Sequence, residues 1–149
     1  MDKERFEELV VELREGRSNC IIVKGEEIFK FSLPGVKTLM TLLKEDPSLL
    51  KGSIVLDKVV GKGAAALMIL GGVAEIYAEL ISEHAIKLLD TTDIKFSYGE
   101  KVPFIENKTK TGFCPIEMLS ISFNNPKEIY KKIQDFFILN EDNRNNKGI

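Results

Sequence analysis

Groups that could bind or transform a small molecule gather in two short stretches of the sequence, DKVVGKG from Asp57 and TGFCPIEML around Cys114. Covalent catalysis needs a nucleophile, a charge stabiliser and a proton carrier, and a thiol, an amine and a carboxylate can fill these roles. In a catalytic protein we expect Cys114 as the nucleophile, Lys62 or Lys58 as the stabilising charge, and Asp57 or Glu83 as the proton carrier. The sequence does not decide whether a reaction takes place.

The first stretch leads into a predicted helix that opens near Gly61. An aspartate just before a helix, such as Asp57, most often caps it by accepting from free backbone N–H groups. Lys58 and Lys62 are four residues apart and are expected to project from one side of the first turns. Because lysines oppose the helix dipole there, they favour an anion docked beside the free amides, although lysines that merely keep an apolar helix soluble explain them too. Gly61 and Gly63 each weaken a helix by up to about 1 kcal/mol, which close approach of a ligand or of another backbone would explain.

The second stretch and one further turn contain the other candidate site residues. Cys114 precedes Pro115, which is favoured at the first helical position, so the thiol is expected at a helix N-cap, where its pKa falls. Glu117 would cap the same turn reciprocally, and a small buried thiol is the alternative for Cys114. Ser82 and Glu83 stand where a predicted strand ends and a helix begins, the usual ligand crevice of an open α/β sheet, although simple capping also explains them.

Metal and triphosphate sites find little support in the sequence. It contains one histidine and two cysteines, without CxxC, HxxxH or HxE spacing, so we expect no metal and no cofactor. A Walker loop requires Ser or Thr after its Gly-Lys pair and a glycine further upstream. Here Gly61-Lys62 is followed by Gly63 and the upstream glycine is missing, which argues against a nucleoside triphosphatase.

Hydrophobic periodicity predicts the elements that would position these residues. Helices are expected over residues 3–15, 36–46, 64–70, 83–93 and 126–139, and strands over 19–24, 27–32, 53–57, 74–82, 94–99 and, as a short piece, SISF at 120–123. Because helices and strands alternate after an initial hairpin, the fold class is α/β, a three-layer α/β/α sandwich with a mixed sheet of about five strands.

Composition indicates an ordinary globular protein. Hydrophobic residues make up 44% and charged residues 30% of the 149 residues, so we expect one domain over residues 1–139 and a disordered tail over 140–149. The net charge of −2 does not indicate a positively charged surface that would attract nucleic acid or an anionic membrane, and we expect neither as a partner. The start of the sequence is charged and amphipathic, unlike a secretory signal. The longest apolar run has about a dozen residues, whereas a membrane span needs roughly 20. Both features predict a cytoplasmic protein.

The run LDKVVGKGAAALMILGGVAEIYAELISEHAIKLL, together with SYG and TGFCPIEML, resembles the domain of unknown function 1893 over roughly Asn19 to Leu119. That family resembles the cytidine deaminase-like fold. The resemblance implies that the helix near Gly61 replaces the deaminase helix beginning His-Ala-Glu or Cys-Ala-Glu, and that SEHA from Ser82 replaces Pro-Cys-x-x-Cys. A zinc deaminase needs three nitrogen or sulfur ligands and a glutamate, which these positions lack.

Our leading hypothesis is a deaminase-fold protein without zinc that binds a small anionic or nucleotide-like ligand, with thiol-dependent catalysis left open. The alternative is a non-catalytic structural or interaction protein, as a homodimer, whose pocket is vestigial and filled by its own side chains. The candidate site comprises Cys114, Asp57 and Lys62 as catalytic residues, and Lys58, Gly61, Gly63, Ser82 and Glu83 as ligand-binding residues.

Overall fold

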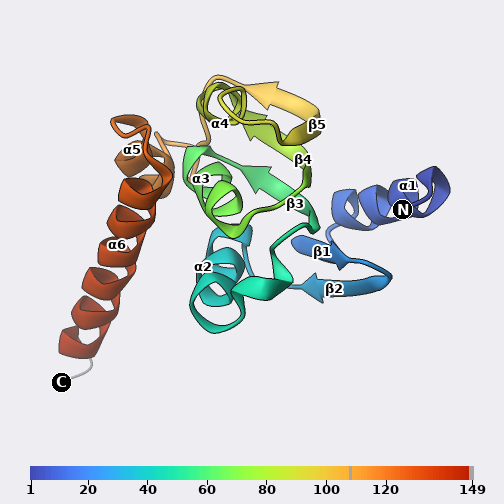
Figure 1. The fold of residues 1–149 in the computed structure, drawn as a ribbon. Helices are drawn as coiled ribbons and strands as arrows, with labels where there is room; N and C mark the ends of the chain where they lie inside the picture. Colours follow the sequence, from blue (N-terminus) through green and yellow to red (C-terminus); the bar gives the residue numbers. More distant parts are fainter. Residues whose placement is uncertain (108, 148–149) are drawn as a thin grey trace.

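A five-stranded sheet in the order β2-β1-β3-β4-β5 forms the centre of the computed structural model, which describes residues 1–107 and 109–147 (Figure 1). β1 is antiparallel to both β2 and β3, whereas β3, β4 and β5 are mutually parallel. The mixed α/β sheet expected from the sequence is thereby confirmed. The strands are β1 (Cys20–Lys24), β2 (Glu27–Phe31), β3 (Ile54–Val60), β4 (Glu75–Ser82) and β5 (Lys95–Val102).

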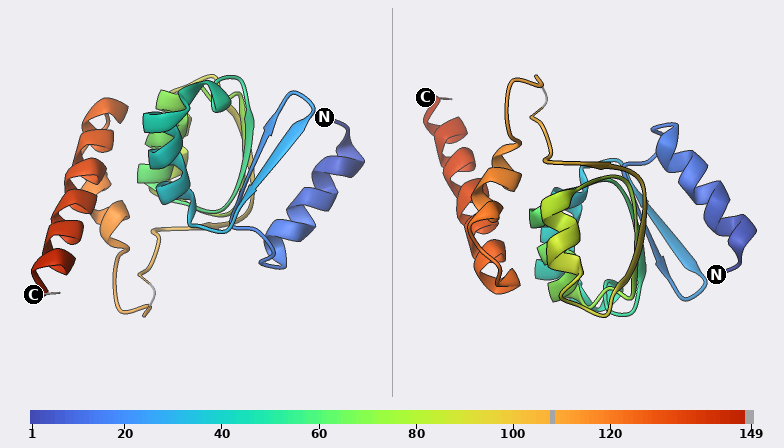
Figure 2. Two further views of the ribbon diagram at one scale, coloured as in Figure 1. Left: turned by 90° about the horizontal axis from the view of Figure 1, so that it is seen from below. Right: turned by 90° about the horizontal axis from the view of Figure 1, so that it is seen from above.

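Helices cover both faces of the sheet, as predicted (Figure 2). One helix, α1, lies on one face, where Leu9 and Leu13 pack against Ile21 and Leu56. Three helices, α2 to α4, cover the opposite face, and α5 and α6 lie outside them. The helices are α1 (Lys3–Arg14), α2 (Gly35–Glu45), α3 (Lys62–Gly71), α4 (Glu83–Leu89), α5 (Pro115–Ile121) and α6 (Pro126–Lys147), with a short 3-10 turn η1 (Pro47–Leu49).

The apolar helix α3 is buried between the sheet and the outer helices. Its alanines Ala64 to Ala66 and the following Leu67 belong to the main core. A Cβ added at Gly63 would lie 2.7 Å from the Ile116 side chain of α5, so a larger residue there would push the two helices apart. Close helix packing therefore accounts for this glycine.

Two sequence expectations around DKVVGKG are wrong. β3 continues through Val60 because its β-branched residues pair with Leu80 and Ile81 of β4, so Asp57 lies inside a strand and does not cap a helix. The N-cap of α3 is Gly61, without a side-chain cap. Lys58 and Lys62 consequently do not share a helix face.

The C-terminal region also differs from the prediction. SISF forms the end of α5 and the turn after it rather than a strand. α6 passes Leu139 and continues to Lys147, since no proline or glycine interrupts residues 127–147. The helix thus enters the tail expected to be disordered, and the last two residues of that tail lie outside the described residues. None of the described helices is both long and apolar enough to cross a bilayer.

Candidate functional site

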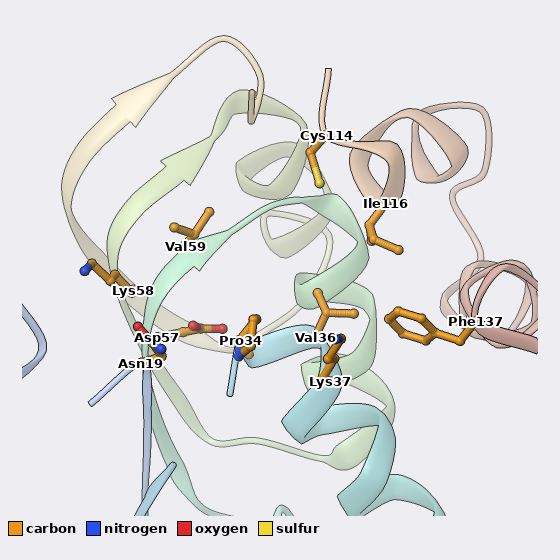
Figure 3. Close-up of a pocket in the computed structure, with 11 residues that line it drawn as sticks. Asn19, Pro34, Val36, Lys37, Asp57, Lys58, Val59, Cys114, Ile116 and Phe137 are labelled. Atoms are coloured by element: carbon orange, nitrogen blue, oxygen red, sulfur yellow. The ribbon is translucent and has the colours of Figure 1, made fainter. Parts of the chain in front are cut away.

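A cavity of about 380 Å³ opens where β3 meets the first turn of α2 (Figure 3). The start of α2 and the second half of β3 form two of its walls, and residues of α5 and α6 form the others. Most of its wall is apolar. It is lined by Asn19, Pro34, Gly35, Val36, Lys37, Asp57, Lys58, Val59, Cys114, Ile116 and Phe137.

Asp57 is the unusual member of this wall. It is only 1% exposed, and its Oδ2 is the one buried side-chain nitrogen or oxygen without a hydrogen-bond partner in the described part of the chain. Burial raises the pKa of Asp57 to about 7, although backbone N–H groups of Val59 and Lys58 partly offset this. The sheet therefore holds a carboxyl group that can gain or lose a proton near neutral pH.

The first turn of α2 packs directly against this carboxyl group. A Cβ built on Gly35 would overlap the Asp57 carboxyl atoms, so residue 35 must be glycine for the two to coexist. The N-cap of α2 is Pro34, which makes no side-chain cap. The carboxyl group thus lies beside the positive end of a helix without forming a conventional cap.

A smaller cavity of about 60 Å³ adjoins the first and shares Val36, Val59, Cys114 and Ile116 with it. Gly61, Gly63 and Glu117 also line this smaller space. Cys114 is the N-cap of α5, before Pro115, as the sequence predicts. Its N–H donates to the carbonyl of Ile105 over 2.8 Å, and its thiol is half-buried.

Glu117 joins three separate segments of the chain. Its Oε1 accepts from the N–H of Lys62 at 2.8 Å and from the Ser82 hydroxyl at 3.0 Å, and its Oε2 accepts from the N–H of Ile105 at 2.6 Å. The residue is 1% exposed. The sequence predicts that Glu117 caps its own turn beside Cys114, and this prediction is wrong. Its side chain reaches across to α3 and α4 instead.

The two lysines of the first stretch point away from the cavity. The Lys62 ammonium donates to the carbonyl of Ile121 at 2.9 Å and to the Asn124 amide oxygen at 3.0 Å, so it holds the end of α5. Desolvation lowers the pKa of Lys62, and the nearby charge of Glu117 partly opposes this. Lys58 reaches the turn at Gly16 on the α1 side, and Figure 3 shows its amine directed away from the other lining residues.

The predicted site residues thus fall into separate groups. Asp57, Lys58 and Cys114 line the larger cavity, whereas Gly61 and Gly63 line the smaller one. Ser82 caps α4 by accepting from the N–H of Ala85 at 3.1 Å, and Ser82 and Lys62 both bind Glu117. Glu83 is exposed at the start of α4 and belongs to neither cavity lining.

Sequence reasoning missed the bridging role of Glu117 and the contribution of Gly35 and Phe137. A signal for Glu117 was available, because an acid between Ile116 and Leu119 in a short apolar helix is costly unless its carboxyl group is satisfied. Gly35 follows Pro34, and a Pro-Gly pair is typical of a turn between two elements, so it gives no sign of a role in a site. Phe137 lies within the helix predicted over residues 126–139, and no local pattern distinguishes it from the other apolar residues of that helix.

Comparison with known proteins finds a family model and a solved structure that agree with each other. The family model described as TM1506, domain of unknown function (DUF1893), matches residues 8–137. The crystal structure of a DUF1893 family protein from Thermotoga maritima is 30% identical and superposes with a TM-score of 0.80, covering 91% of each chain. No curated protein matches the chain.

Proposed function

Since the chain belongs to the DUF1893 family, whose description assigns no activity, we propose a function from the site itself: the protein binds a small nucleotide-like molecule in the 380 Å³ cavity. Pockets for small organic ligands commonly begin at about 300 Å³ and combine apolar walls with a few polar groups. The cavity has both features. A nucleoside-sized molecule fits this description.

The observation that carries the proposal is the unpartnered oxygen of Asp57. A buried carboxyl group without its full set of partners costs stability, and apolar residues would fill the same space better. The cost is understandable if a ligand completes the hydrogen bonding. The flat ring of Phe137 and the side chains of Val36 and Ile116 would contact the ligand's apolar body, and the exposed Lys37 suits an anionic end at the rim.

The architecture that we propose is cytidine deaminase-like, with the zinc centre replaced by protein hydrogen bonds. In such a fold the first turns of α3 and α4 would carry the metal ligands. Here these turns offer Lys62 and Ser82, and both are bound to the Glu117 carboxyl group. A carboxyl group already surrounded by N–H and O–H donors is a poor zinc ligand, so these residues do not fit the metal.

Native mass spectrometry of freshly purified protein tests the proposal. We expect each chain to retain a small molecule that denaturation releases, and no stoichiometric zinc. Asp57→Asn should reduce the retained fraction about tenfold or more, because a hydrogen bond to a charged group is worth about 1.5–3 kcal/mol. Asp93→Asn is the matched control, since Asp93 is exposed and lies in neither cavity lining.

Two results would contradict the proposal: a bare chain that also binds no nucleoside or nucleobase added to it, or one zinc ion per chain. The same spectrum gives the subunit count. A bare homodimer would favour the alternative of an interaction protein with a vestigial pocket.

Thiol-dependent catalysis is a second candidate function, favoured by the presence of Cys114 and Asp57 in the lining of one cavity. If Cys114 attacks the ligand, Cys114→Ser should retain the molecule in the native spectrum and fail to convert it. Cys20 cannot substitute, because it is fully buried in β1. Conversion at the wild-type rate by the serine variant would eliminate this candidate.

A further inference from the structure

The surroundings of Asp57 indicate which chemical group of the ligand lies next to its carboxyl group. This inference rests on the proposed function. Asp57 forms none of the ion pairs found among the described residues. The side-chain amide of Asn19, which lines the same cavity, donates to the carbonyl of Ser32 and makes no hydrogen bond to the Oδ2 of Asp57. The Asp57 carboxyl group therefore has acceptor capacity that its own surroundings do not use.

The titratable groups on the surrounding elements do not neutralise this carboxyl group. Lys58 on β3 reaches the opposite face of the sheet, and Lys62 on α3 is bound at the end of α5. On β4, the residue paired with Asp57 is Ala78, which carries no charge. The remaining groups are the exposed Lys37 on α2, the half-buried thiol of Cys114 on α5, and the buried thiol of Cys20 on β1, whose pKa is raised by burial and by the charge of Asp57.

We propose that the cavity binds its ligand through a planar N–H donor group of the amidine type, as found on aminated heterocycles, which pairs with the carboxyl group of Asp57. An amidine-type group is planar and carries N–H donors, one of which can bond the unpartnered Oδ2 of Asp57. An anionic group at this depth would meet a like charge in an apolar wall whenever Asp57 is ionised, which disfavours it above pH 7. A flat ring attached to the donor packs between Val36, Ile116 and Phe137.

The protonation of Asp57 gives this recognition a pH dependence. The pKa of the free carboxyl group is raised to about 7, so a cationic donor must bind the ionised form and displace its proton below that pH. Affinity for such a donor should rise between pH 6 and pH 8. An anionic ligand would behave in the opposite way, because it binds best to the protonated acid.

Three molecules of the same shape test the inference: benzamidine, a cationic donor; benzamide, a neutral donor and acceptor; and benzoate, an anionic acceptor. Each is titrated into the ¹⁵N-labelled full chain at pH 8, and binding is read from the backbone amide signals of Gly35, Val36 and Val59, which line the cavity. We expect benzamidine to bind at least about tenfold more tightly than benzoate, with benzamide between them. Asp57→Asn should remove the preference for benzamidine, whereas Asp93→Asn should keep it.

The outcomes separate this inference from the proposed function. Equal binding of all three molecules, or tighter binding of benzoate, would overturn the donor assignment and leave a ligand pocket in place. Shifts that are confined to amides outside the cavity would also overturn it. If no molecule moves the cavity amides and the native spectrum shows a bare chain, both the inference and the proposed function fail.

Discussion

Replacing Glu117 by alanine is expected to lower the free energy of unfolding by about 2–6 kcal/mol. The substitution leaves the N–H groups of Lys62 and Ile105 buried without their acceptor, and each such loss costs about 1–3 kcal/mol. It also releases the Ser82 hydroxyl, although this group can turn to another partner. Because small domains are stable by only about 5–15 kcal/mol, this is among the most damaging single changes available in the chain.

Urea denaturation of the wild type and three variants measures this effect. Glu117→Gln keeps the size of the side chain but turns an NH₂ group toward at least one donor, so we expect an intermediate loss. Glu128→Ala removes an exposed acid in the first turn of α6 and should change stability by less than about 1 kcal/mol. A Glu117→Ala variant as stable as the Glu128→Ala variant would show that the three hydrogen bonds do not hold α5 in place.

The second large effect concerns Asp57, whose removal should stabilise the protein at high pH. Between pH 4 and pH 7 the folded state holds a proton that the unfolded chain has lost, so stability falls as the pH rises through this range. A rise of the pKa from 3.8 to about 7 corresponds to about 4 kcal/mol, all of it present as a penalty above pH 7. Asp57→Asn carries no such penalty.

We therefore expect the advantage of Asp57→Asn over the wild type to grow by about 3 kcal/mol between pH 5 and pH 8. Denaturation curves at several pH values measure it directly, with Asp93→Asn as the exposed control. Parallel pH profiles for the wild type and Asp57→Asn would show that the carboxyl group titrates normally. The expected result would mean that the Asp57 carboxyl group lowers the free energy of unfolding and that the fold forms without it.

Periodicity predicted most of the fold because local patterns specify it. The charged spacing of α1, the hairpin glycine between β1 and β2, and the alanine-rich α3 all follow from short-range preferences. The boundary between β3 and α3 was missed because the strand is extended by its pairing with β4, a contact between distant residues. The local pattern therefore predicts Asp57 at a helix end, whereas the structure places it inside the sheet.

The candidate site was predicted in part. Asp57 and Cys114 do meet in one cavity although they are far apart in sequence, and Lys58 contributes to the same wall. The sequence favours Lys62 as a stabilising charge, yet its ammonium binds the end of α5, a partner that no local pattern reveals. The bridging position of Glu117 likewise depends on how α5 packs against α3 and α4.

A ¹³C NMR titration of the Asp57 carboxyl group, assigned by its loss in Asp57→Asn, tests most directly whether this residue is a ligand-binding acid. We expect a midpoint near pH 7 in the free protein, and a midpoint lower by at least about one unit with saturating benzamidine, because a cationic donor favours the ionised form. A midpoint near 4 in the free protein, or one that benzamidine leaves unchanged, would contradict the role assigned to Asp57.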